Sequence, residues 1–287
     1  MDNKPKYGQQ VLVLLLFFVG AFLVASCLQV VALMFGMDIQ NINHLLVLQA
    51  VTQLIVFVVP PVLLAVVYKH NAKELFCLDF GAKRWLQALI AIVILVLTVP
   101  MIDWLTQWND GWHFGGTFAA VEEALRSAGE AALELTAKLV AADNVGQLLT
   151  NLVVIALVPA VCEELFFRGT LQQLMRKWVG NPHVAVIVTA VVFSLAHGEV
   201  FAFVPRFVLG ALLGYLFYYS GSILVNIVAH FVNNATVVVA YYLSTQGVLG
   251  FSPDEPLNVM WQWTALFTVA GIGLLYSNFI MDHKESR

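Results

Sequence analysis

The chain has 287 residues, of which 60% are hydrophobic and only 11% are charged. A soluble globular domain carries about 25% charged residues, so this composition excludes an ordinary soluble protein and indicates a polytopic membrane protein. The net charge of −4 and the lack of a basic patch with interleaved aromatic residues exclude nucleic acid as a partner. The three cysteines, Cys27, Cys77 and Cys162, match neither a disulfide framework nor a metal-binding spacing.

Eight apolar runs are long enough to cross a bilayer as helices. They fall at about 11–36, 44–68, 85–102, 147–170, 183–199, 202–219, 222–243 and 259–281. The first run follows lysines, as in a signal peptide, but it is too long for that role and predicts a retained first span. We therefore predict an all-α polytopic membrane protein with about eight transmembrane helices and a functional site inside the bundle.

Basic residues occupy alternate loops, which is the bias that marks cytoplasmic segments. They lie before the first span, after the second and fourth spans, and in the C-terminal tail: Lys4, Lys6, Lys69, Lys73, Lys83, Arg84, Arg168, Arg176, Lys177, Lys284 and Arg287. This bias predicts a multi-pass protein of the cell (inner) membrane with both termini in the cytoplasm. Three spans then occupy 1–102, an extracytoplasmic loop 103–146, the central spans 147–243, and the last span with its tail 244–287.

The loop at 103–146 is the one sizeable segment predicted outside the membrane. Its first part is rich in tryptophan and glycine, as expected at a membrane interface. From about 117 to 142, apolar residues recur at helical spacing among several glutamates, which predicts an amphipathic helix on the outer face. We interpret it as a solvated connector, with a lid or a partner surface as the alternatives.

Ionisable side chains interrupt the fourth span, within LVPAVCEELFFRGTL at Leu157 to Leu171. Charged groups at membrane depth are costly and normally face the interior of a bundle, so they are functional candidates. On a helix, Glu164 and Arg168 share one face and can pair. Glu163 points about 100° away, so it is directed at a different partner.

Two later spans also carry polar side chains. His197 ends the fifth span, and His230 and Asn234 lie four residues apart on one face of the seventh. A rise of 1.5 Å per residue places Glu163 and His197 about 22 Å from the cytoplasmic helix ends, with His230 and Asn234 at roughly 12 and 18 Å. The four groups can therefore meet in an intramembrane pocket that opens toward the cytoplasm.

Such a set of groups is suited to hydrolysis. A carboxylate withdrawn from water makes a general base, and a neighbouring histidine can hold a water molecule. A second histidine and an asparagine can donate hydrogen bonds to a developing oxyanion. Base, water and oxyanion donors together suit the hydrolysis of a peptide bond.

Three motifs in this order resemble the type II CAAX prenyl endopeptidase family, whose bacterial members are also called the CPBP or abortive-infection family. They are E-E-x-x-F-R at Glu163–Arg168, F-x-x-x-H at Phe193–His197 and H-x-x-x-N at His230–Asn234. The glycines of Gly210-x-x-x-Gly214 match too, and the resemblance covers about residues 147–240. It implies an intramembrane protease with an eight-span helical core, in which 147–243 is the catalytic CAAX-protease-like part.

The resemblance also implies a role for each motif residue. Glu163 would be the general base that activates water, and His197 would help to bind that water. His230 and Asn234 would stabilise the oxyanion, and the supporting residues would be Glu164, Arg168 and Phe193. It implies no cofactor and no metal. The partners would be the lipid bilayer and a peptide or protein substrate, prenylated or not, and the oligomeric state is not specified.

Three other interpretations stay open at this stage. Two glutamates and two histidines could hold Zn²⁺ in a zinc-dependent version of the same protease, although H-E-x-x-H is absent. The chain could instead be a non-proteolytic membrane scaffold or a bacteriocin-immunity-type factor that inherited the site. A proton-coupled transporter also uses intramembrane Glu and His, but its inverted repeat is not seen.

Overall fold

A computed structural model describes residues 6–38, 40–71, 76–77, 81–250, 252–253, 255–257 and 259–281. These residues form helices and their connections, and none of them is in a strand. Seven helical segments among them are long and apolar enough to cross a membrane. In chain order they are α1 (Tyr7–Met34); α2 (Ile42–Gln53) with η1 (Leu54–Val58) and α3 (Val59–Tyr68); α5 (Ala82–Asp110); α7 (Val145–Asn151) with η3 (Leu152–Leu157), α8 (Val158–Phe166), η4 (Phe167–Gln172) and α9 (Gln173–Val179); η5 (Val200–Ala202) with α11 (Phe203–Ser220); α12 (Ile223–Thr245); and α13 (Trp261–Leu275) with η6 (Tyr276–Ile280).

The predicted all-α, multi-pass fold is confirmed, but the predicted fifth span is shorter than expected. It forms α10 (Pro182–Leu195), an apolar helix of 14 residues. At 1.5 Å per residue it covers about 21 Å, less than the roughly 30 Å of a bilayer core. The helix stops because Gly198 takes a left-handed conformation, with φ 73°, and is followed by the charged Glu199. The chain then returns through α11, so α10 ends at the depth of the candidate site.

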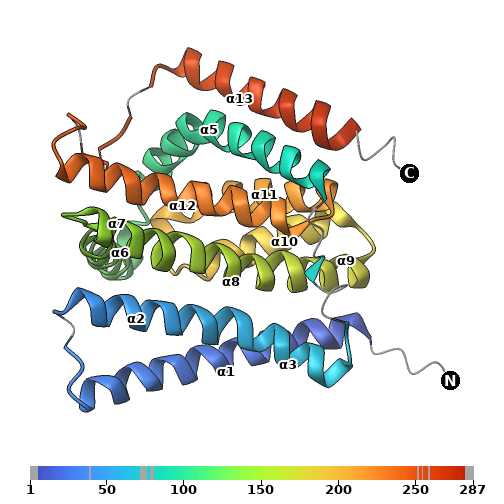
Figure 1. Cartoon of the computed structure of the whole chain (residues 1–287), viewed down its shortest axis with the longest axis horizontal. Coiled ribbons are helices and arrows are strands. Elements are labelled where there is room, and N and C mark those ends of the chain that lie inside the picture. The colour runs from blue at the N-terminus through green and yellow to red at the C-terminus, as the bar shows by residue number, and fades with distance from the viewer. Residues whose placement is uncertain are drawn as a thin grey trace.

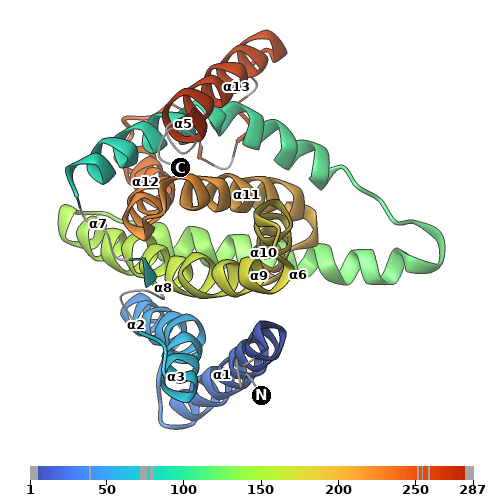
Figure 2. The same ribbon diagram turned by 90° about the vertical axis from the view of Figure 1, so that its right-hand side faces the viewer.

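The helix that carries Glu163 is the central element of the bundle. α8 packs against α2 and η1 on one side and against α12 on the other. Figure 2 shows α1, α2 and α3 grouped on one side of α8, with α5 and α13 on the far side of α11 and α12. Helices from both ends of the sequence therefore enclose α8, which keeps its polar side chains away from lipid.

Widened, π-helical turns adjoin the central helix. η3 and η4 precede and follow α8, and η1 packs against it. η1 and η3 each lead directly into a helix that starts with proline, at Pro60–Pro61 and at Pro159. A proline has no N–H for the α-helical bond to the residue four positions earlier, and the π turn accommodates that loss. Single π turns of this kind occur frequently at functional sites.

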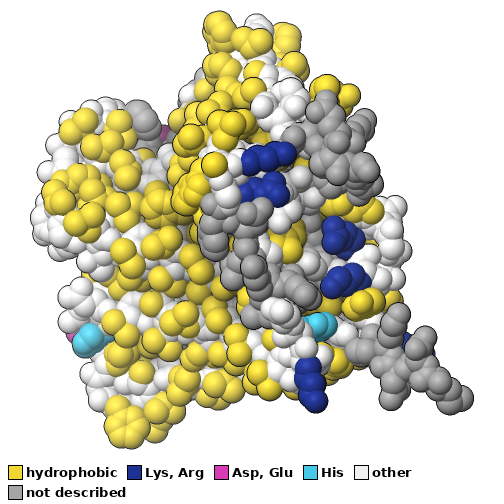
Figure 3. Space-filling view, turned by 45° about the vertical axis from the view of Figure 1, so that its right-hand side comes forward, with side chains coloured by type: hydrophobic (Ala, Val, Ile, Leu, Met, Phe, Trp, Pro, Cys, Tyr) yellow, Lys and Arg dark blue, Asp and Glu magenta, His cyan; other side chains and the backbone are white. Residues whose placement is uncertain are grey.

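Basic residues of the predicted cytoplasmic loops gather at one end of the bundle, except Arg168, which was expected after the fourth span and is instead buried within the bundle beside Glu164. The ring of Tyr7, at the start of α1, lies 5.7 Å from Lys177 Nζ of α9, and His70 after α3 contacts Gln10. Figure 1 shows that α1 begins and η6 ends at this same end. Lysine and arginine side chains are visible on this face in Figure 3. Of the predicted basic set, Lys4, Lys73, Lys284 and Arg287 lie outside the described residues.

The predicted amphipathic helix is present as α6 (Ala119–Val140), after the short turn η2 (Gly116–Phe118). It lies at the end of the bundle opposite the basic face (Figure 1). Arg126 anchors it, donating to the backbone oxygens of Asp110 at 3.0 Å and Trp112 at 2.6 Å. The guanidinium also lies 3.9 Å from the centre of the Phe201 ring. α6 is therefore fixed across the end of α5 and the turn between α10 and α11.

We expect the segment just before η2 and α6 to loosen when Glu122, which accepts hydrogen bonds from the Phe114 and Gly115 amides, is neutralised. A hydrogen bond from His113, then one from the backbone N–H of Phe114, lowers the pKa of Glu122 from 4.5 to about 2. A depressed carboxyl pKa contributes stability above pH 4.5 that is lost as the pH falls through about 2. In Glu122→Gln at neutral pH, hydrogen exchange of the Phe114 and Gly115 amides should accelerate. The neighbouring Glu123→Gln should leave it unchanged, and equal rates in both variants would contradict the prediction.

Candidate active site

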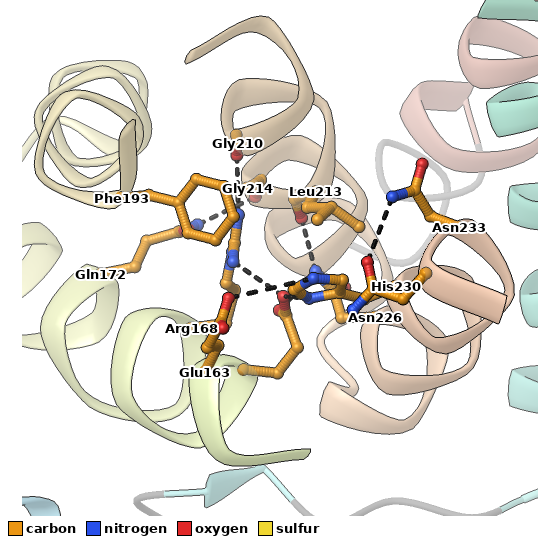
Figure 4. A network of polar contacts seen from close by, with 12 residues as sticks. Glu163, Arg168, Gln172, Phe193, Gly210, Leu213, Gly214, Asn226, His230 and Asn233 are labelled. Atoms are coloured by element: carbon orange, nitrogen blue, oxygen red, sulfur yellow. Dashed lines mark hydrogen bonds and ion pairs between the residues drawn. The ribbon is translucent and has the colours of Figure 1, made fainter. Parts of the chain in front are cut away.

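Glu164 is fully buried and is the centre of a polar network. Arg168 Nη1 donates to its Oε1 at 2.7 Å, so the predicted spacing does bring the two residues together. His230 Nδ1 lies 2.8 Å from the same oxygen. Asn226 Nδ2 donates to Oε2 at 3.1 Å (Figure 4). The carboxylate thus has partners on both oxygens, as a charge in the membrane interior requires.

Arg168 is also fully buried, and α10 and α11 complete its surroundings. Its Nη2 donates to the backbone oxygen of Gly210 at 2.9 Å. The guanidinium lies 4.9 Å from the ring centre of Phe193 and 5.9 Å from that of Phe167. Both terminal nitrogens of the guanidinium are therefore hydrogen-bonded and its face is covered, as a buried charge pair requires, while its buried Nε has no partner in the described structure. Phe193 therefore belongs to the site because it covers the arginine.

Glu163 points away from this pair, as its position one residue earlier predicts. Its side chain is only 6% exposed, and its Oε1 accepts a hydrogen bond of 3.3 Å from Gln53 Nε2 of α2. Its Oε2 lies 3.9 Å from His230 Nε2. This separation is longer than a hydrogen bond, so one small polar group can contact both atoms. His230 therefore stands between the two glutamates, bonded to Glu164 and facing Glu163.

The contacts of His230 define which nitrogen carries the proton. Nδ1 faces a carboxylate oxygen, which can only accept, so Nδ1 is the donor. In the neutral ring, Nε2 then has the lone pair and faces Glu163. Its ring also lies 6.1 Å from that of Phe193. The hydrogen bond to Glu164 thus fixes both the orientation of the His230 ring and the nitrogen that carries its proton.

His197 and Asn234 are not part of this network. His197 is exposed at the end of α10, where its Nδ1 lies 2.8 Å from the backbone oxygen of Phe193. Asn234 Oδ1 accepts a 3.3 Å hydrogen bond from Asn233. No hydrogen bond or ion pair joins either residue to the two glutamates within the described chain. Of the four residues expected to meet at one depth, the structure brings together Glu163 and His230.

Three further polar residues of the site were not predicted as site residues. Asn226 bonds Glu164 and also donates to the backbone oxygen of Leu213 at 2.7 Å. Gln172 donates to the backbone oxygen of Gly214 at 2.9 Å, and Gln53 reaches Glu163. The available signal for Asn226 was its place four residues before His230. For Gln53 and Gln172 it was only an amide within an apolar span, which is much less specific.

The two glycines of the Gly-x-x-x-Gly pattern allow α11 to approach its neighbours closely. A Cβ at Gly210 would lie 3.0 Å from Phe193 Cδ1 and 3.4 Å from the Cα of Ala190. A Cβ at Gly214 would lie 2.9 Å from a methyl group of Val186. Both positions therefore require glycine for close packing, and Gly210 also presents its carbonyl to Arg168.

We expect Gly210→Ala to destabilise the protein by about 1–3 kcal/mol, because the added methyl group overpacks the contact with Phe193. Thermal unfolding in detergent measures the effect. Gly20→Ala in α1 is the control, since a Cβ there meets nothing within 4 Å. It should be neutral or should stabilise by up to about 1 kcal/mol, as alanine does in a helix. Equal midpoints for the two variants would contradict this prediction.

The site is closed in this conformation. Glu163 and His230 are 6% and 4% exposed. A cavity of about 580 Å³ lies elsewhere, beside α6, and is lined by α5, α6, the start of α11 and the residues Pro253, Glu255 and Pro256. Neither glutamate nor His230 lines it. A reactant therefore reaches Glu163 only when side chains or helices around it move.

The described residues contain no group of three or more His, Cys, Asp or Glu side chains placed to hold a metal ion. Glu163 accepts a hydrogen bond from Gln53, while the buried Arg168 occupies the position beside Glu164 where a cation would bind. Cys162 is buried next to the acidic pair, as expected for a packing residue.

The fold and the site together define a multi-pass helical membrane protein with a buried glutamate–histidine–arginine centre. Residues 145–236 match the family model described as type II CAAX prenyl endopeptidase Rce1-like. The predicted family resemblance is thereby confirmed over a region that includes all three motifs. No curated protein and no solved structure matches the chain.

Proposed function

We propose that this protein is an intramembrane endopeptidase in which Glu163 activates a water molecule. The observation that carries the proposal is the placement of His230, which Glu164 holds at 2.8 Å while its other nitrogen faces Glu163. A carboxylate that faces an oriented histidine nitrogen provides two of the groups that acid–base hydrolysis requires. The match to an endopeptidase family model over residues 145–236 supports the same reaction class.

The reaction begins when Glu163 removes a proton from water and the resulting hydroxide attacks the peptide carbonyl. His230 Nε2 faces Glu163, and once it is protonated it donates a hydrogen bond to the developing oxyanion. Asn234 is one helical turn further along the same face of α12 and supplies an amide donor to the oxyanion. Glu163 then passes its proton to the leaving nitrogen, so the C–N bond breaks and the carboxylate is regenerated.

His197 takes part through its position at the end of α10. Its Nδ1 faces a backbone oxygen and must be the donor, so Nε2 carries the lone pair when the ring is neutral. A histidine in that form can hold a water molecule for Glu163. Because α10 ends within the bilayer, His197 sits on a chain turn that can approach the carboxylate when substrate enters.

The substrate is a peptide or protein segment, and the bilayer is the second partner. A prenyl group on the substrate would lie in the lipid beside the bundle, while the peptide enters the site. In this proposal the protein lies in the cell (inner) membrane and the basic end of the bundle faces the cytoplasm, because lysine and arginine side chains are concentrated on the cytoplasmic side of membrane proteins.

The test is cleavage of a quenched prenylated tail peptide by the purified full-length protein. Wild type, Glu163→Ala and His230→Ala are compared, each with and without a strong zinc chelator. We expect cleavage by wild type that survives the chelator and is lost in both variants. Full cleavage by Glu163→Ala would overturn the mechanism, and cleavage that requires zinc would replace it with a metalloprotease.

A further inference from the structure

We propose that Gln53 of α2 is a positioning residue for the reaction, acting through Glu163. The inference rests on the proposed function of Glu163 and adds a residue from the second span. Gln53 lies far outside the matched region 145–236. It contributes the one hydrogen bond that the described structure shows on the Glu163 carboxylate, at 3.3 Å.

The amide of Gln53 has a defined orientation. Its Nε2 must face Glu163, because an amide oxygen turned toward a carboxylate would place two acceptors together. The other amide atom, Oε1, is buried and has no hydrogen-bond partner in the described structure. Buried amide oxygens are normally satisfied, so an orphaned one beside a carboxylate needs an explanation.

A reactant water supplies that explanation. A water molecule bound to Glu163 gives one hydrogen to the carboxylate and has a second hydrogen to donate. Because His197 lies outside the network in this structure, Gln53 Oε1, on the same planar amide that contacts Glu163, is the available acceptor for that second hydrogen. With both hydrogens held, the lone pair of the oxygen is directed toward the substrate carbonyl. Gln53 thus orients the water while its N–H orients the base.

The backbone around Gln53 fits this role. Gln53 is the last residue of α2, and the π-helical η1 begins at the next residue. η1 packs directly against α8, which carries Glu163. A π turn at this point re-aims a side chain toward the partner helix, as such turns do at functional sites. The contact joins residues that are 110 positions apart in the chain.

The kinetic test compares Gln53→Met with Gln29→Met in the full-length protein, using the quenched prenylated peptide. Methionine keeps the length of the side chain and removes its amide. Gln29 is the matched control, since its Nε2 donates to Thr52 Oγ1 at 2.9 Å between α1 and α2 and not to Glu163. We expect Gln53→Met to lower kcat about tenfold or more with KM changed less than about twofold, as for a lost positioning contact. Gln29→Met should keep both constants within about twofold of wild type.

A combined variant separates positioning from a structural role. In the Glu163→Ala background, Gln53→Met should lower the residual rate less than about twofold, because residues that act as a unit are not additive. Gln53→Asn has an amide that is one methylene shorter in reach, and it should lower kcat as much as Gln53→Met does. It replaces the methionine variant in the test if that variant does not fold. Unchanged kcat in a folded Gln53 variant would overturn the inference. Full activity in Glu163→Ala would instead overturn the proposed function.

An infrared measurement needs no substrate. The carboxylate band of Glu163 is obtained as the difference spectrum between wild type and Glu163→Gln. We expect this band to shift in Gln53→Met, because Glu163 Oε1 loses the hydrogen bond from Gln53. The band should keep its position in Gln29→Met. A band that is the same in both variants would show that Gln53 does not hold the carboxylate.

Discussion

Glu163→Gln will lower kcat for peptide cleavage by about 10²–10⁴-fold, the range that a general base contributes. The substitution keeps the size of the side chain and an oxygen that accepts from Gln53, but an amide cannot take up the proton of water. Among the residues that the structure describes, none places a cationic group within hydrogen-bond distance of Glu163, and His230 Nε2 is 3.9 Å away. The variant should therefore fold as wild type does, and its loss of rate will be chemical.

The measurement is a Michaelis profile on the quenched prenylated peptide, with thermal unfolding in detergent as the check on folding. We expect KM and the unfolding midpoint to stay near their wild-type values. Glu199→Gln is the control, since Glu199 pairs with Arg206 on the turn after α10 and does not touch Glu163. It should cleave at a rate close to that of wild type. Equal rates for the two variants would exclude Glu163 as the base.

The sequence predicted the fold and the centre of the site because both depend on local chemistry. Long apolar runs have one stable form in lipid, so helices and their order followed from hydropathy. The i, i+4 spacing of Glu164 and Arg168 placed both groups on one face, where they pair at 2.7 Å. The 100° turn between adjacent residues sent Glu163 elsewhere, toward α2.

The site features that the sequence did not predict depend on contacts between helices far apart in the chain, which a local sequence pattern cannot indicate. Gln53 meets Glu163 only because α2 packs on α8, and a single amide in an apolar span is not diagnostic. Depth arguments placed His197 level with Glu163, but its lateral position depends on where α10 ends. The left-handed Gly198 and the short α10 leave it bonded to Phe193 instead. Depth along the membrane normal can be estimated from the sequence, but the position of a side chain in the membrane plane is set by tertiary packing.

Arg168→Met will destabilise the protein by about 3–5 kcal/mol, because it leaves Glu164 as an uncompensated charge in the bundle interior. Both side chains are fully buried, so no water can take the place of the guanidinium. The acceptor oxygen of Gly210 also loses its donor. The free energy of unfolding, measured by titration from mild micelles into SDS, should fall accordingly. Arg206→Met is the control: its pair with Glu199 is partly exposed, so its loss should cost about 0–1 kcal/mol.

A second substitution tests whether the stranded charge is the cause. Glu164→Gln combined with Arg168→Met removes both charges and keeps an amide oxygen as acceptor for one of the two donors, His230 or Asn226. We expect the double variant to recover a substantial part of the stability lost in Arg168→Met, since an uncharged pair avoids the cost of an unpaired ion. If the double variant is no more stable than Arg168→Met, then packing of the guanidinium against Phe193 outweighs charge pairing. In that case Arg168 stabilises the site chiefly by filling the space between α8, α10 and α11.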